Sequence, residues 1–243
     1  MNAIRNRPQL PPADKKGWYE TMNNYGWSRP DTGPSGEQFT AHSSQSSLWS
    51  LDIGCGYGFQ TAAAIKAGAR VVANDLNQDH LSITASMVPA HLSLNLRTRK
   101  GHFNKISLPS GAFGAILAAN VLHFMDGKTL EAASRKMFRL LAPGGKVFAH
   151  AQSPYISKCK EFIPVYEERK ASGVKWPGVV EDWRREPIQY AMIGLFHFLD
   201  PETLSRGFAE AGFVIDEATY LAADLKDRKL DGRERVILVA RKP

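Results

Sequence analysis

The sequence predicts an α/β protein whose largely parallel sheet is covered by helices on both faces. From about residue 47 onward, short apolar runs alternate with segments of helical periodicity, which is typical of successive βαβ units. The first apolar run leads into the glycine-rich stretch LDIGCGYGFQ, where strand-like sequence changes to helix-like sequence. The chain has 243 residues, which is enough for one such domain with additional segments.

The first half of this alternation begins with the strand SLWSLDI and a helix that ends at Gly68. The second strand is RVVAND, and Asn77 is a natural N-cap for a helix that runs to Pro89. The third strand is expected within residues 92–100. The fourth strand is the continuous apolar run FGAILAAN, which is typical of a strand buried on both faces.

The second half continues with a helix between Gly127 and Leu141, where apolar residues recur at helical spacing. A Pro-Gly-Gly turn then leads into the fifth strand, KVFAHAQ. Asp200 and Pro201 begin a capped helix. The last two strands are expected over FVIDEATYLA and ERVILVAR.

Two segments interrupt the alternation. Residues 1–46 are rich in Pro, Gly, Ser and aromatic residues, and residues 153–198 carry many aromatic residues. A structureless loop of the second length is improbable in a compact domain, so we expect short helices that form a lid. We therefore divide the chain into an N-terminal leader and cap segment (1–46), a ligand-binding domain (47–152 and 199–243) and an inserted lid or substrate-cap segment (153–198).

Composition limits the classes of function. The chain has no apolar run long enough to span a membrane and no secretory signal, and its two cysteines form neither a disulfide framework nor a metal site. We therefore expect a cytoplasmic protein without a metal. The net charge is +7, and basic residues cluster near Arg97, whereas residues 151–200 carry seven Lys or Arg against seven Asp or Glu. A solvated basic face explains this cluster, and an RNA-binding surface is the alternative.

The glycine loop and an acidic residue predict a nucleoside site. Gly54, Gly56 and Gly58 follow the first strand, and glycines there let a ligand approach the main chain at a helix N-terminus. The third glycine of a dinucleotide fingerprint would fall on Phe59, which counts against NAD. Asp75 ends the second strand about twenty residues after the loop, where a carboxylate can accept both ribose hydroxyls.

The stretch Asp52-Ile53-Gly54-Cys55-Gly56-Tyr57-Gly58 resembles the D/E-x-G-x-G-x-G signature of class I S-adenosylmethionine-dependent methyltransferases. The resemblance continues through VVAND, LPSGAFGAILAANVLHFM, FRLLAPGGKVFAH and HFLDPETLSRGFAEAGF, and covers roughly residues 47–240. It implies a seven-stranded sheet of order 3-2-1-4-5-7-6 with the seventh strand antiparallel. It also implies that S-adenosyl-L-methionine is the cofactor and S-adenosyl-L-homocysteine the product.

The same resemblance implies roles by position. Asp52 would contact the methionine ammonium group, Asp75 the ribose hydroxyls and Leu76 the adenine. The backbone of Asn120 would meet the methionine end. His102 stands where the family often has an acidic residue that meets the adenine amino group. The expected cofactor-binding set is Asp52, Gly54, Cys55, Gly56, Gly58, Asp75, Leu76, His102, Phe103 and Asn120, with Cys55 a packing residue and not a nucleophile.

The acceptor side is expected near the carboxyl ends of the strands. His123, His150 and His197 are candidate general bases, although a structural role explains each of them as well. Aromatic residues in the two interrupting segments suit an apolar pocket for a small molecule. The candidate substrate-binding residues are Tyr19, Gln152, Tyr155, Trp183 and Arg184, the last as a partner for a substrate carboxylate.

These features favour a methyltransferase that acts at O or N of a small organic molecule. The Asn/Asp-Pro-Pro-aromatic signature of base N-methylation is missing, which ranks nucleic acid below a small molecule as the substrate. An RNA or protein methyltransferase is therefore the second hypothesis. A nucleotide-binding oxidoreductase or a non-catalytic S-adenosylmethionine binder on the same fold is a further alternative.

Overall fold

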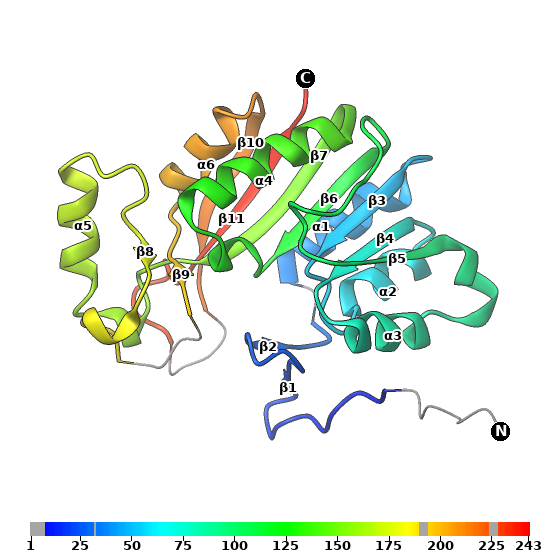
Figure 1. The fold of residues 1–243 in the computed structure, drawn as a ribbon, viewed down its shortest axis with the longest axis horizontal. Helices are drawn as coiled ribbons and strands as arrows, with labels where there is room; N and C mark the ends of the chain where they lie inside the picture. Colours follow the sequence, from blue (N-terminus) through cyan, green and yellow to red (C-terminus); the bar gives the residue numbers. More distant parts are fainter. Residues whose placement is uncertain (1–7, 32, 190–193, 224–227) are drawn as a thin grey trace.

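In the computed structural model of the chain, residues 8–31, 33–189, 194–223 and 228–243 are described. Their main feature is a seven-stranded sheet of order β10-β11-β7-β6-β3-β4-β5 (Figure 1). In chain order this is 3-2-1-4-5-7-6, and β11 runs antiparallel to both of its neighbours, so the expected topology is confirmed. The strands are β3 (Trp49–Ile53), β4 (Arg70–Asp75), β5 (Leu96–Lys100), β6 (Phe113–Ala119), β7 (Leu141–Gln152), β10 (Val214–Leu221) and β11 (Arg235–Arg241).

Helices cover both faces of this sheet, and Figure 1 shows α4 in front of it and α1 behind it. The side chains of β6 separate the two layers, because successive residues of a strand point to opposite faces. Ile116 contributes to the cluster under α4 and α6, whereas Leu117 contributes to the cluster under α1 and α2. The longer helices are α1 (Gly33–Ser44), α2 (Phe59–Lys66), α3 (Gln78–Met87), α4 (Gly127–Leu140), α5 (Ile163–Ala171) and α6 (Pro201–Ala209).

The predicted helix starts carry the expected caps. Asn77 accepts a hydrogen bond from the N–H of Asp79 at the start of α3. Asp200 and Thr203 form a reciprocal capping box at the start of α6, which satisfies main-chain donors that the helix itself cannot. One strand differs from the prediction, since β7 begins at Leu141 and not at Lys146. Leu141 already pairs with Phe113, and the ladder then shifts register across the Pro-Gly-Gly turn.

The N-terminal segment has two parts. Helix α1 packs against β6 and β7 and so belongs to the layer that covers the sheet. Before it, β1 (Tyr19–Glu20) and β2 (Trp27–Ser28) form a small antiparallel pair below the sheet in Figure 1. Residues 1–7 and 32 of the expected leader lie outside the described residues.

The inserted segment contains short helices, as expected, and a small sheet that was not expected. Its elements are η3 (Ser157–Cys159), α5, β8 (Val179–Val180), η4 (Trp183–Arg185) and β9 (Phe196–His197), and residues 190–193 lie outside the described part. Tyr155, Phe162, Tyr166, Phe196 and Phe198 are buried together, so most of its aromatic residues form the segment's own core.

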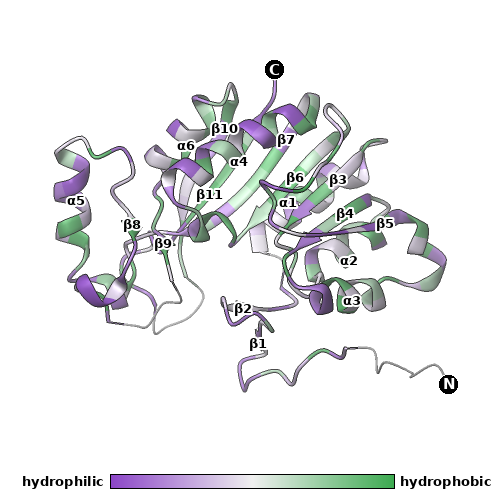
Figure 2. Ribbon diagram, in the orientation of Figure 1, coloured by the Kyte–Doolittle hydropathy of each residue, from purple (hydrophilic) through white to green (hydrophobic). Residues whose placement is uncertain are grey.

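Hydropathy follows this layering. Figure 2 shows the central strands of the sheet as predominantly hydrophobic. Within the described residues, no helix has the length and apolar character needed to cross a bilayer. Both cysteines are buried and unpaired. The remaining short helices are η1 (Ala90–Asn95) and η2 (Leu122–Phe124), and η2 follows β6 at the edge of the sheet where the site lies.

Candidate functional site

A cavity of about 690 Å³ lies along the carboxyl ends of the central parallel strands. The glycine loop after β3, the ends of β4, β6 and β7, and η2 form its floor. N-terminal residues between 14 and 35 form its opposite wall. Its volume is in the usual range for small-molecule and cofactor sites, and the carboxyl edge is where such sites lie in open α/β sheets.

The three glycines of the loop differ in what surrounds them. Gly54 has a φ of 66°, and a Cβ there would lie 2.9 Å from Cγ2 of Val121. Gly56 has a φ of 54°, and a Cβ there would meet only the Ser28 hydroxyl at 3.8 Å, since this glycine borders the cavity. Gly58 has a φ of 79°, does not line the cavity, and a Cβ there would lie 2.4 Å from Thr84. Gly58 therefore serves the turn, whereas Gly56 leaves room for a ligand.

Asp75 is held at the end of β4 by three donors. Its Oδ2 accepts the main-chain N–H of Gly56 at 2.9 Å, and its Oδ1 accepts the N–H of Asn77 at 2.8 Å. The imidazole of His80 also meets Oδ1, at 3.0 Å. Since a carboxylate offers about four acceptor positions, Asp75 keeps capacity for a ligand hydroxyl while its orientation is fixed.

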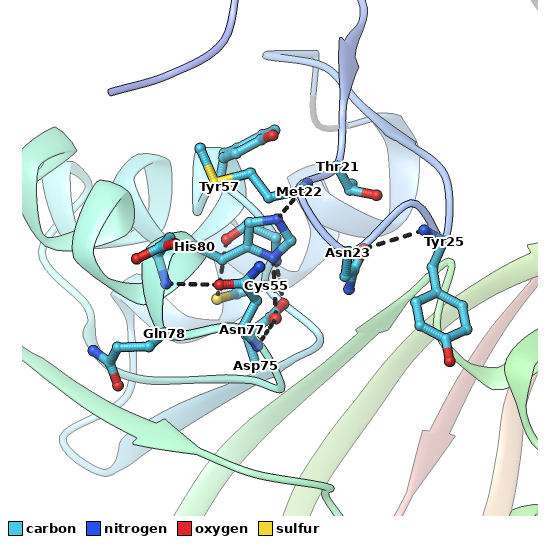
Figure 3. Close-up of polar contacts among 12 residues, drawn as sticks. Thr21, Met22, Asn23, Tyr25, Cys55, Tyr57, Asp75, Asn77, Gln78 and His80 are labelled. Carbon is cyan, nitrogen blue, oxygen red and sulfur yellow. Dashed lines mark hydrogen bonds and ion pairs between the residues drawn. The ribbon is translucent and has the colours of Figure 1, made fainter. Parts of the chain in front are cut away.

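His80 links this carboxylate to the N-terminal segment (Figure 3). Its Nε2 accepts the main-chain N–H of Met22 at 3.1 Å. A main-chain N–H can only donate, so Nε2 carries no proton and Nδ1–H donates to Asp75. The His80 ring is fully buried and packs against Tyr57, whose hydroxyl donates to the carbonyl of Glu20. Residues 20–22 are thus fastened beside the glycine loop.

Asp52 lies at the bottom of the cavity at the end of β3. Burial raises its pKa to about 6, against the opposing effect of a 2.7 Å hydrogen bond from the Thr61 hydroxyl. A buried carboxyl group of this kind favours a cationic partner, because an opposite charge offsets the cost of burying the ionised form.

Two neutral histidines occupy the other end of the cavity. Burial lowers the pKa of His123 and of His150 to about 3, with smaller contributions from His150, Arg228 and other positive groups for the first residue and from Arg235 and Arg29 for the second. His150 Nδ1 bonds to the Ser35 hydroxyl of α1. His123 stacks on Phe196, and its buried Nδ1 has no hydrogen-bond partner among the described residues. Gln152, two residues after His150 on β7, lines the same end.

The cavity brings together most of the residues that the sequence singled out. Those lining it are Asp52, Gly54, Cys55, Gly56, Asp75, Leu76, His102, Phe103, Asn120, His123, His150 and Gln152. Asn120 has a φ of 53° and donates its main-chain N–H to the carbonyl of His150. The apolar side chain of Leu76 is 49% exposed, which suits a flat apolar ligand surface.

Six candidate residues do not line the cavity: Gly58, His197, Tyr19, Tyr155, Trp183 and Arg184. His197 donates from Nδ1 to the carbonyl of Met125 and packs against Trp176, and it is buried. Tyr155 donates its hydroxyl to Glu167, and Trp183 packs against the core of the inserted segment. Arg184 is exposed and is paired with Asp182 at 2.8 Å.

Tyr19 has the opposite orientation from its neighbours. Its ring contacts Tyr57 and Phe59, whereas Trp18 and Glu20 line the cavity, because adjacent residues of an extended chain point to opposite sides. His80, Arg228 and Arg235 also line the cavity, and none of them was predicted from the sequence as a site residue. A histidine one helical turn after the N-cap of the helix that follows Asp75 was a signal for the first of these. The arginines gave no such signal, because their position depends on the antiparallel β11.

The residues present fit a nucleoside cofactor with a cationic end. Gly56 leaves main chain open to the cavity, Asp75 is fixed with acceptor capacity, and Asp52 is a buried carboxyl group. No group of three or more potential metal ligands is found among the described residues.

Comparison with known proteins agrees with this geometry. Residues 51–145 match a family model described as a methyltransferase domain. A search of curated protein sequences gave no match. This match over residues 51–145, together with the order of the strands in the sheet, makes the chain similar to class I S-adenosylmethionine-dependent methyltransferases.

Solved structures share the fold at low sequence identity. An S-adenosylmethionine-dependent methyltransferase from Mesorhizobium loti is 17% identical, with a TM-score of 0.59 over 86% of this chain and 99% of that one. The 1,6-didemethyltoxoflavin-N1-methyltransferase of Burkholderia thailandensis, crystallised with 1,6-didemethyltoxoflavin and S-adenosylhomocysteine, is 18% identical, with a TM-score of 0.61 over 87% and 77%. The glycopeptide N-methyltransferase MtfA is 15% identical, with a TM-score of 0.59 over 88% and 95%.

Proposed function

We propose that the protein methylates an O or N atom of a small organic molecule that binds in the cavity beside the cofactor. One observation carries this proposal: the cavity has a wall formed by N-terminal residues, which are fastened to the glycine loop through His80 and Tyr57. A covered site of this size admits a small molecule and restricts access of a folded macromolecule. The Burkholderia enzyme, whose crystal contains a small heterocycle, shares the fold.

In this proposal the glycine-loop end holds the cofactor. Asp75 accepts the ribose hydroxyls, Leu76 covers the adenine, and Asp52 faces the methionine ammonium group. The main chain at Gly54, Gly56 and Asn120 borders the methionine portion, and His102 and Phe103 border the adenine. When bound there, S-adenosylmethionine would supply an activated methyl group, carried on its sulfonium, to an acceptor in the same cavity.

The acceptor end then aligns the nucleophile. Alignment of two bound reactants can supply on the order of 7–11 kcal/mol of the barrier. Since the pKa values of His123 and His150 are about 3, both imidazoles are neutral at neutral pH and are weak bases. We therefore assign them to hydrogen bonding and shaping of the acceptor site. Because neither is a strong enough base to remove a proton, we expect an acceptor that is already deprotonated when it binds.

RNA is the weaker candidate because the basic cluster near Arg97 lies away from the cavity. Arg97 and Arg99 are exposed on the edge strand β5, and neither lines the cavity. Charged residues on an edge strand also discourage pairing with other sheets, which is a sufficient reason for their presence.

Isotope transfer tests the choice of acceptor. The protein is incubated with S-adenosylmethionine labelled in the methyl group, together with a pooled library of phenols, amines and carboxylic acids, total RNA or a protein extract. Label in the small-molecule pool, lost in Asp75→Asn and kept in Asp79→Asn, is the expected result. Label that enters only RNA or protein would refute the proposal.

A further inference from the structure

Among the described residues, the acceptor end of the cavity is lined by arginine side chains and by no carboxylate. We define this end by residues 119–125, 150–152, Phe196, Leu221, Arg228 and Arg235. None of the described residues in this set that line the cavity is Asp or Glu. The two carboxylates on the floor of the cavity, Asp52 and Asp75, lie near the carboxyl ends of β3 and β4, and β6 separates these strands from β7 and β11.

The antiparallel β11 brings arginine to this edge of the sheet. Arg235, its first residue, pairs with Gln152, the last residue of β7. Arg228 lies just before it, half-buried, and its carbonyl accepts the N–H of Ser157. Arg29 enters from the N-terminal wall and is paired with Asp31 at 2.6 Å. The charges of Arg228 and Arg235 both act on His123, and those of Arg235 and Arg29 act on His150.

The loop that carries Arg228 is held by a buried carboxylate that does not line the cavity. Glu234 accepts main-chain N–H groups of Ala223, Leu230, Asp231 and Gly232. These donors outweigh the effect of burial and lower the pKa of Glu234 to about 2. The carboxylate of Glu234 is thus used to hold main-chain N–H groups of the loop and does not line the cavity.

A second observation indicates that a ligand belongs here. The Nδ1 of His123 is buried at the cavity wall without a hydrogen-bond partner among the described residues. Buried polar atoms in folded proteins are almost always satisfied, by protein, water or ligand. Among the residues described, the Arg228 guanidinium has no ion pair either. Both residues line the same end of the cavity and the charge of Arg228 acts on His123, so we expect one anionic group bound there to contact both.

We propose that the acceptor molecule carries a carboxylate, which Arg228 and His123 bind while Arg235 and Arg29 supply further positive potential. Arginine holds a carboxylate by two parallel hydrogen bonds, and a neutral imidazole can donate one more. This assignment rests on the proposed function, because it specifies the substrate class for the same cavity. In this proposal Arg228, and not Arg184 as the sequence suggested, is the partner of the substrate carboxylate.

Matched probe pairs test the assignment. Protein loaded with S-adenosylhomocysteine is titrated by calorimetry with aromatic acids and their carboxamides, for example 4-hydroxyphenylacetate and 4-hydroxyphenylacetamide, and with phenyl phosphate. We expect acids to bind about tenfold more tightly than their amides. Arg228→Gln should abolish this preference, Arg228→Lys should keep part of it because the charge remains, and the exposed neighbour substitution Lys229→Gln should leave it intact.

The outcomes separate this inference from the proposed function. If no acid in the panel is preferred over its amide, if the preference persists in Arg228→Gln, or if phenyl phosphate binds more tightly than the acids, the carboxylate assignment is overturned. The affinity of each variant for S-adenosylhomocysteine alone should equal that of the wild type. Failure of the wild type to bind S-adenosylhomocysteine would instead refute the proposed function.

Discussion

The Nδ1 of His80 lies 3.0 Å from Oδ1 of Asp75, and the opposite nitrogen of the same ring accepts the main-chain N–H of Met22. One buried side chain therefore orients the carboxylate proposed to bind the ribose and also fastens the N-terminal segment beside it (Figure 3). This arrangement couples the wall of the cavity to its floor.

We expect His80→Phe to weaken both functions. The substitution leaves the Met22 N–H without its acceptor and removes one donor from Asp75, and two such hydrogen bonds contribute about 1 kcal/mol each. Affinity for S-adenosylhomocysteine should fall about tenfold, and trypsin should cleave faster after Lys16, which precedes Gly17. The exposed His91→Phe is the control. Unchanged proteolysis and affinity in His80→Phe would show that the link has no such role.

Asp75→Asn tests the proposed ribose contact while it preserves the shape of the side chain. The amide removes the charge and replaces one acceptor oxygen with an NH2 donor, so calorimetry should give affinity for S-adenosylhomocysteine reduced by about 10- to 100-fold. Asp79→Asn, on the exposed face of α3, should bind like the wild type. Equal affinities in the two variants would remove Asp75 from the site.

Substitution of alanine for Gly58 and for Gly56 should have different effects, because only Gly56 borders the cavity. Gly58→Ala places a Cβ against Thr84 in a left-handed conformation, so thermal unfolding should show a stability loss of more than about 1–2 kcal/mol. Gly56→Ala carries the backbone cost without a clash in the ligand-free protein. We expect its main effect to be lost cofactor affinity. The prediction is contradicted if Gly56→Ala is the less stable of the two.

Much of the fold could be predicted because its signals are local. Alternating periodicity placed the strands, and Asn77 and Asp200 marked helix starts by their capping chemistry. The glycine loop and Asp75 were found together because both follow adjacent strands of one parallel sheet. Leu141 was missed as a strand residue because its pairing with Phe113 depends on a register shift that has no signal in the sequence.

The acceptor site could be predicted only in part. His123 lines the cavity because it follows the fourth predicted strand, and His150 and Gln152 line it because they lie at the end of the fifth. Which aromatic residues of the two interrupting segments face the cavity depends on tertiary contacts that the sequence does not show. Tyr155 and Trp183, for example, pack in or against the inserted segment's own core. Arg228 and Arg235 reach the cavity only because β11 is antiparallel and begins at the edge where β7 ends.

The buried histidines predict that stability falls in acid. His123, His150 and His197 have folded-state pKa values of about 3, 3 and 4. Below pH 6.5 the unfolded chain therefore takes up protons that the folded chain does not. Each histidine lowers the free energy of unfolding by about 1.4 kcal/mol per pH unit between its unfolded and folded values. Asp52 acts in the opposite direction between about pH 6 and 3.8, because burial raises its pKa, but it is one group against three.

Denaturant unfolding between pH 7 and 5 measures this slope. His197→Asn, which can keep the donor to the Met125 carbonyl, should reduce the slope by the contribution of one histidine. The exposed His91→Asn should leave it unchanged. Stability that rises on acidification, or a slope that does not respond to His197→Asn, would contradict the assignment of these groups as neutral in the folded protein.

Calorimetric titration with S-adenosylhomocysteine and, separately, with NAD tests the central claim most directly. The glycine loop with Asp75 should bind one equivalent of S-adenosylhomocysteine per chain and bind NAD at least about a hundredfold more weakly, a difference of about 2.7 kcal/mol. NAD affinity equal to or above that of S-adenosylhomocysteine, or no binding of S-adenosylhomocysteine at all, would contradict the assignment of this cavity to a methyl-transfer cofactor.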